Sequence, residues 1–97
     1  MRPEEKIESD FVYNAAKEGF WAIKFEDRAR KGAPDRLVLL PEGKAIFIEF
    51  KVPGKEARPE QLDYIRQLRR FGFMAGVYSS AEQALKEVRE FHEADIA

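Results

Sequence analysis

The sequence has 97 residues, of which 36% are charged, and its formal net charge is −1. A chain of this length usually folds as one domain, so we expect residues 1–97 to form a single domain around one hydrophobic core. It contains no cysteine, which excludes disulfides and thiolate metal sites. No apolar run approaches the roughly 20 residues of a membrane span, and the charged N-terminus is unlike a signal peptide. We therefore expect a soluble, cytoplasmic protein without a membrane partner.

The charged residues are distributed unevenly along the chain. Residues 24–70 hold 12 basic and 8 acidic side chains, whereas the segments on both sides are acidic. A basic middle segment is compatible with a polyanionic partner such as nucleic acid. Taken alone, however, the pattern is more typical of ordinary surface charge.

The first part of the chain predicts a helix and a strand. A helix from Pro3 to Gly19 is expected, because proline suits a first helical turn and glycine a helix end. A strand follows at Phe20–Phe25, where apolar and polar residues loosely alternate. The charged, glycine-containing segment from Glu26 to Ala33 is expected to be a loop.

Two further strands are predicted to form a β-hairpin. The first, Arg36–Leu40, is short and apolar, and the second, Lys44–Val52, is rich in isoleucine and phenylalanine. The residues between them, Pro41–Gly43, are typical of a tight turn.

The rest of the chain predicts a loop at Val52–Arg58, a helix, a strand and a last helix. Pro59 suits the start of a helix that ends near Phe71, and we expect its Leu62, Ile65 and Leu68 to face the core. A strand at Phe73–Tyr78 and a helix capped by Ser80 complete the order α-β-β-β-α-β-α. This order predicts an α/β fold in which helices flank a mixed β-sheet.

An acidic and a basic residue share one face of the predicted hairpin. Side chains alternate along a strand, so Glu49 and Lys51 point to the face opposite Ile48 and Phe50. An isolated pair of this kind is usually a solvated strand face. Here the hairpin brings Asp35 back beside Glu49, so that two carboxylates and an ammonium group converge at one end of the sheet.

Such a cluster suits metal-assisted hydrolysis of a phosphodiester. Carboxylate oxygens are ligands of Mg²⁺, which typically binds through one or two carboxylates together with substrate phosphate. A lysine beside the metal can orient a water molecule or stabilise the transition state. Asp35, Glu49 and Lys51 supply these groups.

These residues carry a resemblance to a known family. Pro34-Asp35 followed by Glu49-Phe50-Lys51 is similar to the signature of PD-(D/E)XK nucleases. With Gly32 before the Pro-Asp pair and Gln61 on the following helix, the pattern resembles the VRR-NUC branch, and it covers nearly the whole chain. The family commonly has a serine shortly before the glutamine, a place that Ala57–Glu60 occupies here, which weakens any inference about that position.

The resemblance implies a restriction-endonuclease-like fold and a role for each matching residue. Asp35, Glu49 and the backbone carbonyl of Phe50 would be metal ligands, with Mg²⁺ or Mn²⁺ as the cofactor, and Lys51 would be the catalytic lysine. Gln61 matches the helix glutamine at the edge of the catalytic site, and a polar residue of a first helical turn is the alternative. Glu8 matches an acidic ligand on the first helix, and an ordinary glutamate at a helix start is the alternative.

Basic residues surround this predicted centre, mostly in the two flanking loops. We expect them to contact the phosphate backbone of DNA, which gives affinity without sequence information. They are Arg28, Arg30, Lys31, Arg36, Lys55 and Arg58.

The function implied is metal-dependent DNA endonuclease activity. Small stand-alone members of this family resemble dimeric enzymes that act on branched DNA such as four-way (Holliday) junctions, in bacterial or phage-infected cells. We expect a homodimer whose interface involves Phe11, Tyr13 or Phe91, unless Phe11 and Phe91 are buried in the core. The alternatives are a catalytically silent nucleic-acid-binding module and a subunit of a larger nuclease, and dependence on a divalent metal distinguishes the first of these from an enzyme.

Overall fold

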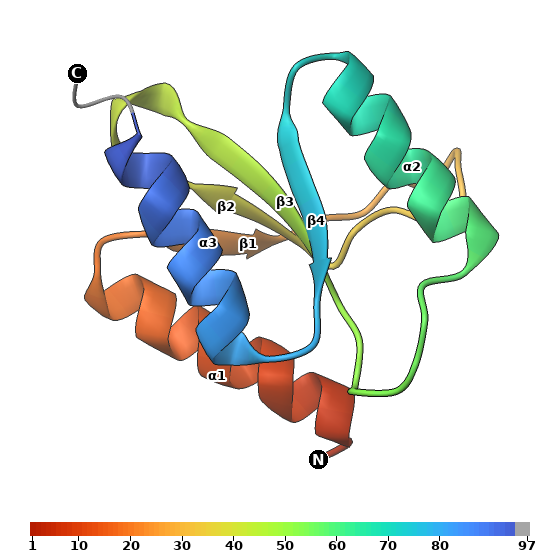
Figure 1. Cartoon of the computed structure of the whole chain (residues 1–97), viewed down its shortest axis with the longest axis horizontal. Helices are drawn as coiled ribbons and strands as arrows, with labels where there is room; N and C mark the ends of the chain where they lie inside the picture. Colours follow the sequence, from red (N-terminus) through yellow and green to blue (C-terminus); the bar gives the residue numbers. More distant parts are fainter. Residues whose placement is uncertain (95–97) are drawn as a thin grey trace.

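The computed structural model describes residues 1–94 and shows a mixed sheet with helices on both of its faces (Figure 1). The predicted order α-β-β-β-α-β-α is confirmed within this part of the chain. The elements are α1 (Pro3–Lys17), β1 (Trp21–Lys24), β2 (Arg36–Leu39), β3 (Ala45–Phe50), α2 (Pro59–Arg70), β4 (Met74–Tyr78) and α3 (Ala81–Glu93).

The four strands lie in the order β1-β2-β3-β4, with β4 parallel to β3 and the other neighbours antiparallel. The predicted hairpin is confirmed, because β2 pairs with β3 and Arg36 lies opposite Ile48. A short 3₁₀ turn at Pro41–Gly43 joins the two strands, closed by a bond of 2.9 Å from the Leu40 N–H to the Lys44 carbonyl. This register brings the residues just before β2 beside the last residues of β3.

The two faces of the sheet are covered by different helices. Ile46, Ile48 and Phe50 alternate along β3 onto the face covered by α1 and α3, where the Phe50 ring packs 5.4 Å from that of Phe11. Phe47 points to the opposite face and packs against Ile65 of α2. The predicted alternation of β3 is thus confirmed.

The predicted orientation of α2 is wrong at one position. Leu62, expected to face the core, is 42% exposed, and its neighbour Gln61 is buried instead. Gln61, Ile65 and Leu68 recur at helical spacing and form the stripe that faces the sheet. A stripe of Leu62, Ile65 and Leu68 has nearly the same helical period, so periodicity alone could not decide whether Leu62 or Gln61 faces the sheet. The hydrogen bonds of Gln61 explain why this polar residue is the buried one.

The predicted cap of α3 is present. The Ser80 hydroxyl accepts a hydrogen bond of 3.0 Å from the Gln83 N–H, as expected for a residue at a helix N-cap. Within residues 1–94, no helix combines the length and the apolar character needed to cross a bilayer.

Candidate metal centre

Three carboxylates meet at the end of the β2–β3 pair. Oxygens of Glu4, Asp35 and Glu49 lie within 4.8 Å of one another. Asp35 directly precedes β2 and Glu49 is next to the last residue of β3, so the hairpin register brings them together. Glu4 comes from the first turn of α1. Three acids at one point repel one another unless a proton or a cation lies between them.

Asp35 is fixed by a backbone hydrogen bond. Its Oδ2 accepts a bond of 2.8 Å from the Phe50 N–H. Burial raises the pKa of the Asp35 carboxyl, and the charges of Glu8 and Glu4 act in the same direction. The carboxylate is thus held in place by the strand that carries Glu49.

Glu49 is the most buried acid of the centre, with only 2% of its surface exposed. Its Oε2 accepts hydrogen bonds from Gln61 Nε2 at 3.0 Å and from Lys51 Nζ at 3.3 Å. Its Oε1 is buried without a hydrogen-bond partner. Burial, and then the charge of Asp35, raise the pKa of Glu49 to about 7.

The unpartnered oxygen allows the centre to be tested as a metal site. A buried carboxylate oxygen without a partner is costly, and a cation bound to it removes that cost. The donors that converge here are carboxylate oxygens, which suit hard divalent cations such as Mg²⁺ and Mn²⁺. The residues present therefore fit a divalent metal, held by Glu4, Asp35 and Glu49.

Lys51 lies beside these acids on the same face of the sheet as Glu49. Its backbone N–H donates to the Tyr78 carbonyl at 2.9 Å, which extends the β3–β4 pairing by one residue. The side chain is 12% exposed, so its ammonium group is largely shielded from bulk water. A cation in this position can neutralise part of the negative charge of a bound phosphate.

Gln61 joins helix α2 to the centre. Its Oε1 accepts a bond of 2.9 Å from the Arg58 N–H at the start of α2, and its Nε2 donates to Glu49. The first bond fixes which end of the amide is oxygen, so the NH₂ group must point at Glu49. Gln61 thus orients the Glu49 carboxylate, and it also satisfies a backbone donor of the helix start.

The structure groups Glu4, and not Glu8, with the other two acids. Glu8 Oε2 accepts hydrogen bonds from Arg36 Nε at 2.6 Å and from Lys24 Nζ at 3.0 Å, so Glu8 holds α1 against β1 and β2. Sequence reasoning missed Glu4, although the signal was present, because Glu4 lies one turn before Glu8 on the same face of α1.

The basic residues expected around the centre differ in their surroundings. Arg36 is turned toward Glu8 and is only 20% exposed, so it contributes to the packing of α1. Arg30 and Arg58 are exposed and form ion pairs with Asp63 and Glu60, respectively. Three of these six basic residues have side chains that make no hydrogen bond or ion pair within residues 1–94, namely Arg28, Lys31 and Lys55.

Gly32 sets the distance between the loop at 26–33 and helix α2. Its φ of +92° favours glycine, and a Cβ at this position would overlap the Glu60 carbonyl oxygen and lie 3.0 Å from the Gln61 nitrogen. We expect Gly32→Ala to lower the free energy of unfolding by at least about 2 kcal/mol more than Gly54→Ala does. Gly54 is the matched control, because its φ is +89° and a Cβ there would meet nothing within 4 Å. Urea denaturation measures the difference, and equal losses in the two variants would contradict the close approach to α2.

Comparison with known proteins places these residues in a family. The sequence profile of the VRR-NUC domain matches residues 3–82, which contain all the residues of the centre. A protein of Acyrthosiphon pisum secondary endosymbiont phage 1, named "Putative nuclease p44", is 49% identical over 59 residues. That match covers 61% of this chain and 63% of the length of the phage protein.

A solved structure agrees with this result. It is described as a VRR-NUC domain, has a TM-score of 0.84 and is 27% identical, and the match covers 94% of this chain and 99% of that chain. The Pro-Asp and Glu-x-Lys residues and the hairpin that joins them all lie within residues 3–82, the region matched by the family profile. The chain therefore belongs to the VRR-NUC domain family.

Proposed function

We propose that the protein is a Mg²⁺- or Mn²⁺-dependent endonuclease that hydrolyses phosphodiester bonds in DNA. The observation that carries the proposal is the buried, unpartnered Oε1 of Glu49, which lies in a cluster of three acids beside Lys51. A surface that only binds DNA has no use for clustered acids next to phosphate. Family membership and the name of the phage relative support the same activity.

Each residue of the centre has a role in the proposed reaction. Glu4, Asp35 and Glu49 hold the cation, with the Phe50 carbonyl as a further ligand. When bound, the metal lowers the pKa of a water molecule and neutralises charge on the scissile phosphate. The Lys51 ammonium group donates to the phosphate oxygen or to the attacking water. Gln61 keeps the Glu49 carboxylate in one orientation through the bond at 3.0 Å.

Three cations near the centre are proposed to hold the DNA backbone. Arg28, Lys31 and Lys55 are exposed and form no ion pair within the described part of the chain. Arg30 and Arg58 add positive charge to the same surface. Contacts of this kind neutralise phosphates and make binding dependent on salt.

Cleavage in the presence and absence of divalent metal tests the proposal. The protein and its Lys51→Ala variant are incubated with linear, flapped and four-way DNA in Mg²⁺, in Mn²⁺ and in a chelator. We expect the wild type to cut only with metal and Lys51→Ala to be slower by about 10²-fold or more. Binding without cleavage under every condition would identify a silent DNA-binding module.

We also propose that the working unit is a homodimer that prefers four-way junctions. A two-fold dimer fixes the distance between two centres, so both can engage only where two strands exchange. Of the three aromatic residues expected at the interface, Phe11 is fully buried and Phe91 packs against the core, which leaves Tyr13, 65% exposed on α1.

The dimer has two measurable consequences. Light scattering should give about twice the chain mass of 11.2 kDa. Cleavage of a four-way junction should exceed that of linear duplex by about tenfold or more, which corresponds to about 1.4 kcal/mol. A monomer that cuts both substrates equally would refute the preference and leave the nuclease proposal intact.

A further inference from the structure

A cavity of about 690 Å³ lies between the loop at 26–33 and the first turn of α2. Its size is that of a small-molecule site. It adjoins the metal centre, because Gly32 is three residues before Asp35 and the Phe25 N–H donates to the Asp35 carbonyl at 3.2 Å. The residues that matter for its chemistry are Phe25, Arg28, Arg30, Lys31, Arg58 and Glu60.

Asp27 makes three of the hydrogen bonds that hold the loop forming one wall. Asp27 Oδ1 accepts hydrogen bonds from the Ala29 and Arg30 N–H groups at 2.9 and 3.2 Å, which closes the loop on itself. Asp27 Oδ2 accepts a bond of 2.8 Å from the Tyr64 hydroxyl, which ties the loop to α2. The wall is therefore formed before any ligand binds.

Arg30 and Gly32 also fasten the loop to the same helix. Arg30 Nη2 donates to Asp63 at 2.8 Å, and its guanidinium lies 5.4 Å from the centre of the Tyr64 ring. Gly32 lies directly against the Glu60 carbonyl. The cavity is thus rigidly connected to α2, whose Gln61 orients Glu49.

The lining of the cavity offers two kinds of contact. Arg28 and Lys31 form no hydrogen bond or ion pair among residues 1–94, so their charges are available to a phosphate. Phe25 offers an aromatic surface, and its ring is fixed by edge contacts with Phe47 at 5.1 Å and Tyr64 at 6.3 Å. Recognition of single-stranded nucleic acid combines two elements. Cationic side chains bind the phosphates, and aromatic rings stack on the bases.

We infer that this cavity binds one unpaired nucleotide of the DNA substrate, with its phosphate at Arg28 and Lys31 and its base against Phe25. The inference rests on the proposed nuclease function and names the kind of substrate that the centre takes. A paired nucleotide has its base stacked within the duplex and can offer only its phosphate to the cavity. An unpaired nucleotide can fill both parts, so the cavity adds affinity wherever a nucleotide beside the cut is unpaired, including at the point where strands exchange in a junction.

Fluorescence anisotropy with two labelled DNAs tests this subsite. One is a blunt duplex, and the other is the same duplex with a short single-stranded thymidine extension. Binding is measured with Asp35→Asn in a chelator, and again with the wild type in a chelator, so that no DNA is cut. We expect the extension to strengthen binding about fivefold or more, the lower end of what one stacked base contributes.

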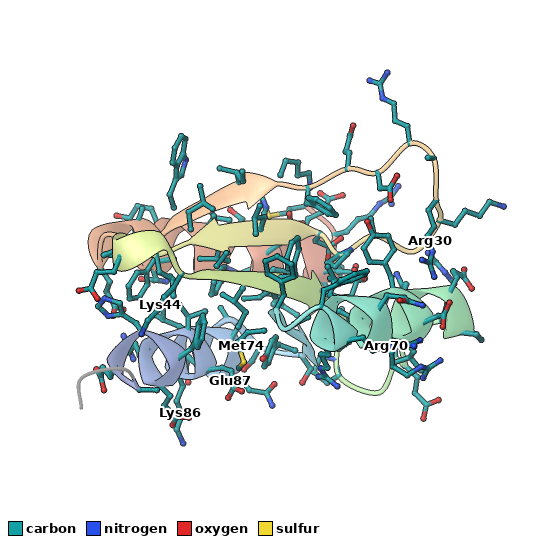
Figure 2. The ribbon with its side chains drawn as sticks, turned by 90° about the horizontal axis from the view of Figure 1, so that it is seen from above. Arg30, Lys44, Arg70, Met74, Lys86 and Glu87 are labelled. Carbon is teal, nitrogen blue, oxygen red and sulfur yellow. The ribbon has the colours of Figure 1, made fainter. Side chains whose placement is uncertain are left out.

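The same measurement on Arg28→Ala/Lys31→Ala assigns the effect to the cavity. This double variant should lose the advantage of the extension, whereas Lys17→Ala/Lys86→Ala, with the same change of charge on α1 and α3, should keep it. Lys86 lies on α3, well away from Arg30 (Figure 2). Equal binding of the two DNAs, or an advantage that survives in Arg28→Ala/Lys31→Ala, would overturn the subsite. Neither result depends on cleavage, so a failure of the nuclease proposal would be seen separately, as an absence of cutting with metal.

Discussion

Replacing Asp35 by asparagine is expected to lower the rate of DNA cleavage by about 10³-fold or more. Asparagine retains an oxygen that can accept the hydrogen bond from the Phe50 N–H, so the backbone at the centre keeps its geometry. The negative charge that attracts the cation is lost, and with it the metal site. Loss of one of three mutually repelling acids should leave the metal-free fold as stable as the wild type, or more so.

The matched control for this variant is Asp10→Asn on α1. Asp10 is also paired with a cation, since Lys6 Nζ lies 3.1 Å from its Oδ2, but it is on the exposed surface of the helix. Single-turnover cleavage measured for the two variants should show the loss only in Asp35→Asn. Full activity of Asp35→Asn in Mg²⁺ would mean that the catalytic centre lies elsewhere.

The free energy of unfolding of the metal-free protein is expected to fall as the pH rises from 5 to 8. The pKa of Glu49 is raised to about 7 in the folded state, from an ordinary value of 4.5. Between these two values the folded protein binds more protons than the unfolded chain, so stability decreases with rising pH and levels off above pH 7. The contribution of Glu49 over this range is about 2 to 3 kcal/mol.

Glu49→Gln isolates this contribution, because the glutamine does not ionise. Both proteins are denatured with urea in a chelator at pH 5, 6, 7 and 8. From pH 5 to pH 8, the free energy of unfolding of the variant should rise by about 2 to 3 kcal/mol relative to that of the wild type. Titration of all other groups largely cancels in the difference. Parallel pH profiles would show that Glu49 has an ordinary pKa and that its burial carries no electrostatic cost.

The order of the helices and strands could be predicted because each element has a signal within its own short stretch of sequence. Alternation along residues 44–52, a tight turn at Pro41–Gly43 and proline at two helix starts determined the order of the elements. The same alternation placed Glu49 and Lys51 on one face, and the hairpin register brought Asp35 beside them. Three of the residues that meet at the centre could thus be predicted from short-range patterns.

The remaining features depend on how separate elements dock, which short-range patterns do not determine. Glu4 and Glu8 lie on the same face of α1, and only the position of that helix against the sheet decides which of them reaches Asp35. The bond between Asp27 and Tyr64 joins residues 37 apart in sequence. Such a contact has no local signal, so the loop at 26–33 could be predicted as basic but not as a preformed wall.

Binding of a divalent cation by the acid cluster is tested most directly by calorimetric titration of Mn²⁺ into the wild type and Glu49→Gln at pH 8, where Glu49 is ionised. The wild type should bind Mn²⁺ at the cluster, and Glu49→Gln should bind it at least about tenfold more weakly, a loss of about 1.4 kcal/mol. No binding to the wild type, or equal binding to both proteins, would show that Glu4, Asp35 and Glu49 do not form a metal centre.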